Sequence, residues 1–126
     1  MADKPMIAVV DDDESMREAT ANLMRSAGFA SETFQSADDF LKSGDPERAH
    51  CLIADVQMPG MSGLDLHTHL RTLGKSVPTL LITAYPNDKA RARAIEAGVV
   101  CYLTKPFNEH ELLDFVQSAI ELKSSE

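Results

Sequence analysis

The chain has 126 residues, 44% of them hydrophobic and 25% charged, which suits one compact domain with its own core. Its net charge of −8 disfavours nucleic acid as a ligand, because the domain would repel phosphates. No apolar stretch approaches the roughly 18 residues of a membrane span, and the N-terminal MADKPMIAVVDDDE reaches acidic residues too soon for a signal peptide. We therefore expect a cytoplasmic protein that binds neither nucleic acid nor membrane.

Five short segments are predicted to be strands. MIAVV and CLIAD are apolar runs without polar alternation, which is typical of strands buried on both faces of a parallel sheet. ASETF alternates, which predicts a more exposed strand at an edge of the sheet. In chain order the strands are MIAVV (6–10), ASETF (30–34), CLIAD (51–55), PTLLIT (78–83) and VVCYL (99–103).

A helix is expected after each strand. Four of the helices end at glycines, namely Gly28, Gly44, Gly74 and Gly98. Four begin at capping residues, namely Ser36, Ser62, Asn87 or Asp88, and Asn108. The last helix has the clearest apolar stripe, formed by Leu112, Phe115, Val116, Ala119 and Ile120. Strands that alternate with helices predict an α/β fold, in which a parallel sheet is covered by helices on both faces.

The cysteines and histidines predict no disulfide framework and no zinc site. Cys51 and Cys101 each lie in an apolar, strand-like run, which predicts buried, reduced thiols. His67 and His69 are two residues apart, which on a helix turns them about 200° away from each other. We therefore expect these histidines on a solvated helix surface.

Polar residues follow the strands at the edge of the sheet where parallel strands end, called here the carboxyl edge. The first strand is followed by Asp11-Asp12-Asp13-Glu14, the third ends in Asp55, the fourth ends in Thr83 and the fifth is followed by Lys105-Pro106. A single Asp after a strand is often only a helix cap. The ordered set, with one member after each of several core strands, instead predicts a ligand site at this edge.

These residue types suit phosphoryl chemistry with a hard cation. Like-charge repulsion makes it costly in free energy for neighbouring carboxylates all to stay ionised, unless a cation such as Mg²⁺ binds between them. A Lys can balance the charge of a phosphoryl group, a Thr hydroxyl can donate to its oxygens, and Asp55 can be the nucleophile that forms an aspartyl phosphate. Asp13 and Glu14 are expected only to open the following helix.

Four segments closely resemble the response-regulator receiver domain of bacterial two-component systems. They are VVDDDESMR, ADVQMPGMSGLDL, LLITAYPNDKARARAIEAG and CYLTKPF. The resemblance covers about residues 5–122 and makes 1–126 a single receiver domain, with 123–126 as a tail or the start of a linker. It implies a flavodoxin-like (βα)5 three-layer sandwich with strand order 2-1-3-4-5.

The resemblance also implies a metal site and a phosphoacceptor. Asp55 matches the residue that accepts the phosphoryl group from a sensor histidine kinase. Asp11 and Asp12 match the acidic pair that holds Mg²⁺, with Asp12 as a direct ligand and Asp11 acting through water. Asp55 and the backbone carbonyl of Gln57 would complete the metal ligands.

Further positions match the family's residues for phosphoryl binding and switching. Thr83 and Lys105 match the residues that bind the phosphoryl group, Tyr102 matches the switch aromatic, and the Lys105–Pro106 bond is usually cis in the family. Gln57 and the bulky Tyr85 would flank the path of attacking water, which predicts slow hydrolysis. The implied role is that of a signalling protein, with no enzymatic activity beyond self-phosphorylation from small donors and autodephosphorylation.

Other functions remain open at this point. A nucleotide-binding module of the same fold would need a phosphate cradle where this chain has four acids. An aspartate-nucleophile phosphatase would place its nucleophile after the first strand, and a pure interaction module would not need Asp55 or Lys105.

The resemblance extends to output and assembly. FQSADDFL and the TKPF context resemble receivers that precede a LuxR-type helix-turn-helix, so a DNA-binding output domain is a predicted partner. Lys89, Arg91 and Arg93 form the densest basic cluster, and we hypothesise phosphorylation-dependent homodimerisation through the fourth helix, fifth strand and fifth helix.

Overall fold

The computed structural model describes residues 4–124, which fold around one five-stranded parallel sheet. The strands lie in the order β2-β1-β3-β4-β5, which confirms the predicted topology. Their bounds are β1 (Met6–Val10), β2 (Ala30–Phe34), β3 (Cys51–Asp55), β4 (Thr79–Thr83) and β5 (Cys101–Thr104). The helices are α1 (Glu14–Ser26), α2 (Ala37–Lys42), α3 (Gly63–Thr72), α4 (Asp88–Glu96) and α5 (Glu109–Ser124), with a 3-10 helix η1 (Pro46–Arg48).

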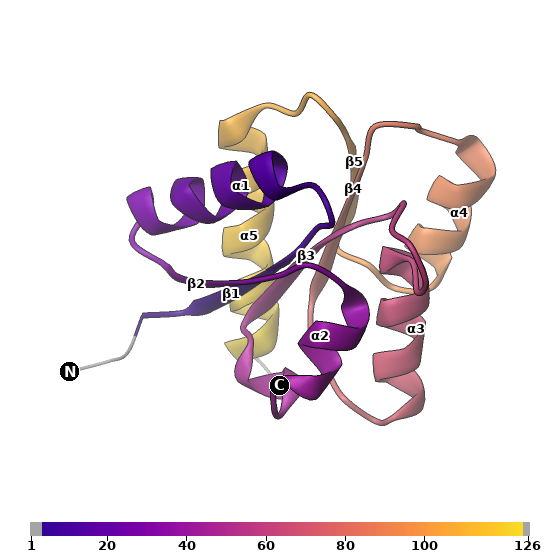
Figure 1. Cartoon of the computed structure of the whole chain (residues 1–126), viewed down its shortest axis with the longest axis horizontal. Helices are drawn as coiled ribbons and strands as arrows, with labels where there is room; N and C mark the ends of the chain where they lie inside the picture. Colours follow the sequence, from indigo (N-terminus) through magenta and orange to yellow (C-terminus); the bar gives the residue numbers. More distant parts are fainter. Residues whose placement is uncertain (1–3, 125–126) are drawn as a thin grey trace.

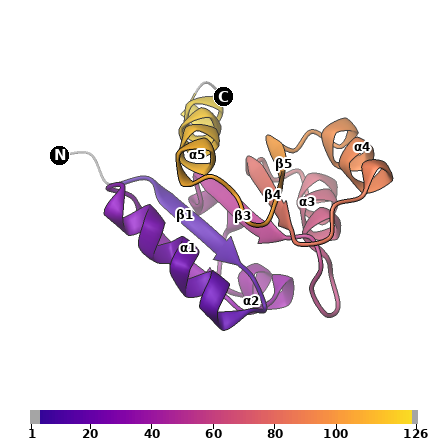
Figure 2. The ribbon, with the colours of Figure 1, turned by 90° about the horizontal axis from the view of Figure 1, so that it is seen from above.

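The sheet separates two hydrophobic cores. Successive side chains of a strand point to opposite faces, so Val9 packs on the face covered by α1 and α5, whereas Val10 packs on the face of α2, α3 and α4. Figure 1 shows α1 and α5 on one side of the sheet and α3 and α4 on the other. Figure 2 shows β1, β3, β4 and β5 following one another across the molecule. This is the three-layer sandwich that was predicted.

Side chains cap the helices at the predicted positions. The hydroxyl of Ser62 accepts from the amide of Asp65, whose carboxylate accepts from the amide of Ser62, so that α3 opens with a complete capping box. Asn87 caps α4 by accepting from Ala90 N at 3.1 Å. Asn108 accepts from Glu111 N at 3.1 Å at the start of α5.

Two predicted strand starts are wrong by one or two residues, and β5 ends at Thr104, one residue later than predicted. β4 begins at Thr79 instead of Pro78, although the carbonyl of Pro78 still accepts from Leu52 N. β5 begins at Cys101 instead of Val99, because the amide of Val99 bonds to the carbonyl of Ala94 in the last turn of α4. Apolar character alone does not reveal which backbone groups the preceding helix uses.

The prediction for the cysteines is confirmed, whereas that for the histidines is wrong at His67. Cys51 and Cys101 are buried and free, and burial raises the pKa of Cys101 to about 12. His67 is only 6% exposed: its ring nitrogens lie 3.0 Å from Thr79 Oγ1 and 3.0 Å from the carbonyl oxygen of Ala97. Because these partners satisfy both nitrogens, the ring is accommodated in the core.

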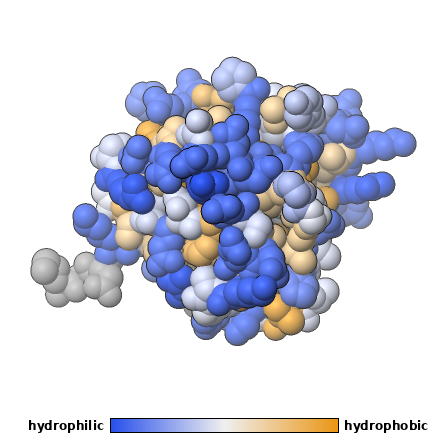
Figure 3. Space-filling view, viewed as in Figure 1, coloured by the Kyte–Doolittle hydropathy of each residue, from blue (hydrophilic) through white to orange (hydrophobic). Residues whose placement is uncertain are grey.

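The described part of the chain contains no helix that is both long enough and apolar enough to cross a membrane. Figure 3 shows a face on which hydrophilic residues predominate and hydrophobic ones are scattered.

Candidate functional site

Three aspartates meet at the carboxyl edge of the sheet and form what we call the acid cluster. Asp11 follows β1 directly, Asp12 comes next, and Asp55 is the last residue of β3. One carboxylate oxygen from each lies within 4.8 Å of the others. Asp11 and Asp55 are 5% and 8% exposed, whereas Asp12 is exposed. The sheet therefore presents two buried carboxylates and one that faces solvent.

Lys105 joins the two buried carboxylates. Its Nζ lies 3.0 Å from Asp55 Oδ2 and 3.3 Å from Asp11 Oδ2. Burial alone would lower the pKa of Lys105, but the hydrogen bond to Asp55 and the charges of both acids outweigh burial and raise it. The ammonium group therefore stays charged, and it compensates part of the negative charge of the acid cluster.

Backbone amides fix the orientation of both buried carboxylates. Asp13 N donates to Asp11 Oδ1 at 2.9 Å, and Gln57 N donates to Asp55 Oδ1 at 3.0 Å. Burial raises the pKa of Asp11, although the amide of Asp13 and the ammonium group of Lys105 oppose the shift. In each acid one oxygen is held by an amide while the other faces Lys105, so that Asp55 Oδ2 is directed toward the centre of the site.

Asp13 and Glu14 have the helix-opening roles that were predicted for them. Asp13 caps α1 by accepting from Met16 N at 3.1 Å, and Glu14 lies in the first turn. Arg17, which the sequence did not single out, donates to the carbonyl of Asp11 at 2.9 Å and ties α1 to the loop that carries the acid cluster.

A buried hydroxyl lies beside the acids at the end of β4. Thr83 Oγ1 donates to Gln57 Oε1 at 2.5 Å and accepts from Tyr85 N at 2.9 Å. The contact of the Gln57 side chain with Thr83 was not predicted: Gln57 was expected to bind the metal through its backbone carbonyl and to flank the path of attacking water. The structure thus assigns Gln57 two contacts, one to Asp55 through its amide and one to Thr83 through its side chain. The ring of Tyr85 is 73% exposed and extends into solvent.

The structure places the remaining predicted residue, Tyr102, on β5 away from the acid cluster. Its side chain is buried in the core beneath α3 and α4. The Lys105–Pro106 peptide bond is cis, as the resemblance implied.

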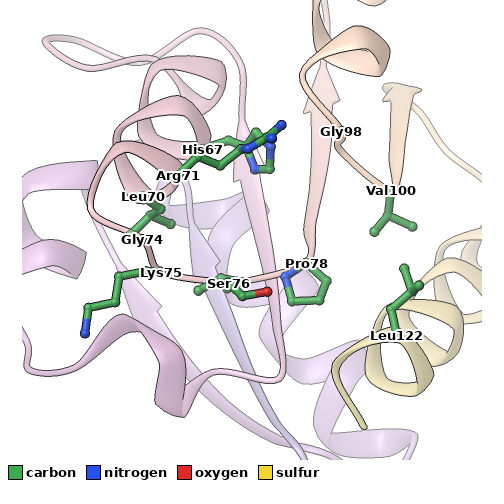
Figure 4. A pocket seen from close by; sticks show the side chains of 11 residues that line it. His67, Leu70, Arg71, Gly74, Lys75, Ser76, Pro78, Gly98, Val100 and Leu122 are labelled. Carbon is green, nitrogen blue, oxygen red and sulfur yellow. The ribbon is translucent and has the colours of Figure 1, made fainter. Parts of the chain in front are cut away.

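Two hollows flank the sheet at different ends. One, of about 460 Å³, lies at the loop between β3 and α3 and is lined by Val56, Gln57, Met58, Pro59 and Ser62. The other, of about 450 Å³, lies among the C-terminal end of α3, the starts of β4 and β5, and the last turns of α5. Figure 4 shows His67 and Arg71 on one side of it and Val100 and Leu122 on the other. None of the predicted site residues lines this second hollow.

The donor set of the acid cluster suits a hard divalent cation. All three candidate ligands offer carboxylate oxygen, the ligand type that Mg²⁺ prefers, and one of them is exposed to solvent that can complete the coordination shell. Two buried carboxylates balanced by one lysine leave negative charge that a cation would offset. The residues present therefore fit the predicted metal.

Comparisons with known proteins identify the class of protein. The family model of the response regulator receiver domain matches residues 7–117. The chain is 41% identical over 117 residues to the response regulator protein TodT of Pseudomonas putida, covering 93% of this chain and 52% of that protein. It is 42% identical over 118 residues to nodulation protein W of Bradyrhizobium diazoefficiens, covering 94% and 52%.

Solved structures agree with these sequence relatives. The response regulator StyR superposes with a TM-score of 0.90 at 43% identity, covering 97% of this chain and 62% of that one. FixJ-N superposes with a TM-score of 0.85 at 32% identity, covering 96% of both chains. This chain belongs to the response regulator receiver domain family, whose members act in two-component signalling. It spans about half the length of the curated relatives that it matches.

Proposed function

We propose that this receiver domain accepts a phosphoryl group on Asp55 from a sensor histidine kinase in a reaction that requires Mg²⁺. The observation that carries the proposal is the contact of Lys105 Nζ with Asp55 at 3.0 Å and with Asp11 at 3.3 Å. This geometry holds the ammonium group of Lys105 where negative charge would develop on a phosphoryl group during transfer. Signalling without turnover of a substrate is the role that the family supports.

The proposed transfer makes one bond and breaks one. Asp55 Oδ2 attacks the phosphorus of a phosphohistidine, and an O–P bond forms while the P–N bond breaks. The electron pair of the broken bond returns to the imidazole, which carries a proton on its other nitrogen and leaves as neutral histidine. The ammonium group of Lys105 can donate to the phosphoryl oxygens, and the hydroxyl of Thr83 can do so once it no longer donates to Gln57.

Asp11, Asp12 and Asp55 are the residues that would hold the metal, with the backbone carbonyl of Gln57 as a further proposed ligand. Bound Mg²⁺ would neutralise charge on the phosphoryl oxygens and orient them. Asp12 is the exposed member of the acid cluster, so it can bind a cation without losing a buried partner.

Labelling with acetyl phosphate and Mg²⁺ tests the phosphoacceptor. The parent is expected to take up one phosphoryl group per chain in an acid-stable, base-labile bond, and Asp55→Asn to take up none while remaining folded. Asp13→Asn is the matched control, because it neutralises a neighbouring acid but retains a good helix cap. Undiminished labelling of Asp55→Asn at another single site would refute the assignment, and continuous turnover would indicate a phosphatase instead.

Thermal unfolding with and without Mg²⁺ tests the metal site. A ligand that binds only the folded state raises stability with its concentration, so the melting temperature of the parent should rise with Mg²⁺. Asp12→Ala should reduce this rise, whereas Asp13→Ala should lower the stability at every Mg²⁺ concentration, by about 1 kcal/mol through loss of the cap, and leave the rise intact. Equal Mg²⁺ dependence of Asp12→Ala and the parent would contradict the metal role.

Partners follow from the family as proposals. We propose a cytoplasmic location, where a kinase of this class presents its phosphohistidine, and a DNA-binding output domain as the effector. We also propose that phosphorylation promotes homodimerisation through α4, β5 and α5, called here the α4–β5–α5 face, in which Tyr102 acts as the switch aromatic. The exposed cations Lys89, Arg91 and Arg93 of α4 would contribute to this face.

A further inference from the structure

The burial of Tyr102 leaves one polar atom without a partner. The side chain is 3% exposed and packs in the core on the α3 and α4 side of the sheet. Within the described part of the chain, its hydroxyl is buried and finds no hydrogen-bond partner. A buried, unsatisfied hydroxyl opposes burial of the ring. Leaving this hydroxyl unsatisfied therefore offsets part of the free energy gained by burying the aromatic ring.

Arg91 supplies two interactions to Tyr102. Its guanidinium carbon lies 5.0 Å from the centroid of the Tyr102 ring, within the range of a cation–π contact. Its Nη1 also donates to the backbone carbonyl of Tyr102 at 3.3 Å. No carboxylate of the described residues forms an ion pair with this guanidinium. The contacts of Arg91 are thus directed to one residue of β5.

Helix α4 contributes little else to the core at this point. Ala94 is its one buried residue, and Ala90 is only partly buried. A helix with so small an apolar contact area depends on its remaining tertiary contacts for position. The contact of Arg91 with Tyr102 therefore ties the position of α4 to that of the aromatic ring.

We propose that Arg91 is a positioning residue for Tyr102 and sets the fraction of molecules in which the ring is buried. The guanidinium covers the ring and favours burial, whereas the unsatisfied hydroxyl favours exposure. The two effects oppose each other, so a change in either moves the equilibrium. This inference rests on the proposed function in one respect: the equilibrium affects signalling only if the position of Tyr102 is coupled to a phosphoryl group on Asp55.

The χ1 rotamer populations of Tyr102, measured by NMR from three-bond couplings, test the positioning role directly. The parent should show predominantly the buried rotamer. Arg91→Ala should lower the ratio of buried to exposed rotamer by about fivefold, the effect of losing one cation–π contact at the surface. Tyr102→Phe, which removes the unsatisfied hydroxyl, should raise that ratio. Unchanged couplings in Arg91→Ala would overturn the proposal.

Two further variants separate the contact from general effects on α4. Arg93→Ala removes another exposed cation of the same helix. Among the described residues, the cation–π contact and the guanidinium hydrogen bond of Tyr102 come from Arg91 and not from Arg93, so this variant should leave the couplings of Tyr102 unchanged. Arg91→Lys keeps charge and helix propensity but loses the planar guanidinium, and should give an intermediate ratio. Equal shifts in Arg91→Ala and Arg93→Ala would show an effect of charge on the whole helix and would overturn the specific contact.

Beryllofluoride, a mimic of the phosphoryl group, tests the link to the site. If the buried rotamer favours its binding, Arg91→Ala should weaken the affinity by up to about fivefold. In a Tyr102→Ala background, Arg91→Ala should have no further effect, because the residue through which it acts is absent. A parent that binds no beryllofluoride would refute the proposed function, while the rotamer measurement would still decide the role of Arg91. Equal affinities of the parent and Arg91→Ala would overturn the coupling.

Discussion

At the scale of single residues, the hydroxyl of Thr83 is held by two hydrogen bonds, one to the side chain of Gln57 and one from the amide of Tyr85. Thr83 has one proton to donate, and it donates it to Gln57 Oε1. A phosphoryl oxygen would therefore compete with Gln57 for this donor. Gln57→Leu keeps the size of the side chain and removes the acceptor, so it should tighten beryllofluoride binding by about fivefold, the effect of one hydrogen bond.

Titration calorimetry of beryllofluoride binding provides the measurement, with Tyr85→Leu as the control. Tyr85 reaches Thr83 only through its backbone amide, and its ring is 73% exposed, so this variant should bind as the parent does. Weaker binding by Gln57→Leu would mean that Gln57 assists the phosphoryl group instead of competing with it. The slow hydrolysis predicted from the bulk of Tyr85 stays a prediction.

His67 makes a second prediction at this scale, which concerns pH. Burial, with a smaller effect of Arg71, lowers the pKa of His67 below its value in the unfolded chain. At pH values near the unfolded pKa, the unfolded state binds more protons than the folded state. The stability that depends on His67 therefore decreases as the pH falls from the unfolded pKa toward the folded pKa. Urea unfolding should therefore show a smaller loss of stability between neutral and mildly acidic pH in His67→Gln than in the parent.

His69→Gln is the matched control for this pH dependence, because His69 lies on the same helix and is only half-buried. It should lose stability with falling pH as steeply as the parent. An equally steep loss in His67→Gln would show that other groups cause the acid sensitivity.

These residues also show what the sequence could predict about the site. Asp11, Asp55, Thr83 and Lys105 were predictable, because each comes at the end of a strand and parallel strands share one carboxyl edge. The Gln57 side chain and the burial of His67 were not, because both depend on contacts between elements distant in the chain. A polar residue type carries no signal of which distant partner will satisfy it.

At the scale of elements, the start of α3 is closely fitted to the end of β3. A Cβ added at Gly63 would lie 2.5 Å from the backbone oxygen of Asp55 and 3.0 Å from Leu81 Cδ2. Alanine is better than glycine in a helix by about 1 kcal/mol, but a contact this close to backbone cannot be relieved by a side-chain rotation. We expect Gly63→Ala to destabilise the fold by about 1–3 kcal/mol and to reduce phosphorylation of Asp55.

Chemical denaturation and acetyl phosphate labelling check this prediction together. Ser62→Ala is the control at the adjacent position: loss of its cap should cost about 1 kcal/mol of stability without displacing Asp55. Full labelling of a stable Gly63→Ala variant would show that α3 can shift away from β3 without affecting the site.

The elements themselves were largely predictable, because their signals are local. Capping residues and the apolar stripe of α5 gave the helices, since those interactions lie within a few residues of one another. The start of β5 and the 3-10 helix Pro46–Arg48 were missed. The first depends on the hydrogen bonds of the preceding helix, and the second is a single turn too short to show a periodic pattern.

At the scale of the whole molecule, charge both opposes and directs association. Each chain carries a net charge of −8, so two copies repel each other at long range. Helix α4 nevertheless exposes Lys89, Arg91 and Arg93, and α5 opens with the exposed acids Glu109 and Glu111. The proposed α4–β5–α5 face thus contains both signs, which lets one copy pair its cations with the acids of another at short range.

Salt distinguishes the long-range repulsion from the short-range pairs. The Debye length falls from about 10 Å at 0.1 M to about 3 Å at 1 M ionic strength, so repulsion between whole chains is already largely screened at the lower value. We expect beryllofluoride to promote self-association in sedimentation experiments at about 0.1 M salt, and this association to weaken toward 1 M as the short-range pairs are screened. Arg93→Ala should weaken the association at low salt and reduce its salt dependence.

Lys42→Ala provides the matched control for this prediction, because Lys42 is an exposed cation of α2 that pairs with Asp38 within its own helix. The variant has the same net charge as Arg93→Ala, so any difference between the two reports where the cation lies and not how many there are. Equal self-association with and without beryllofluoride would refute phosphorylation-dependent dimerisation of this domain. Equal weakening by both variants would instead show that the position of the cation does not matter, and would place the association outside the α4–β5–α5 face.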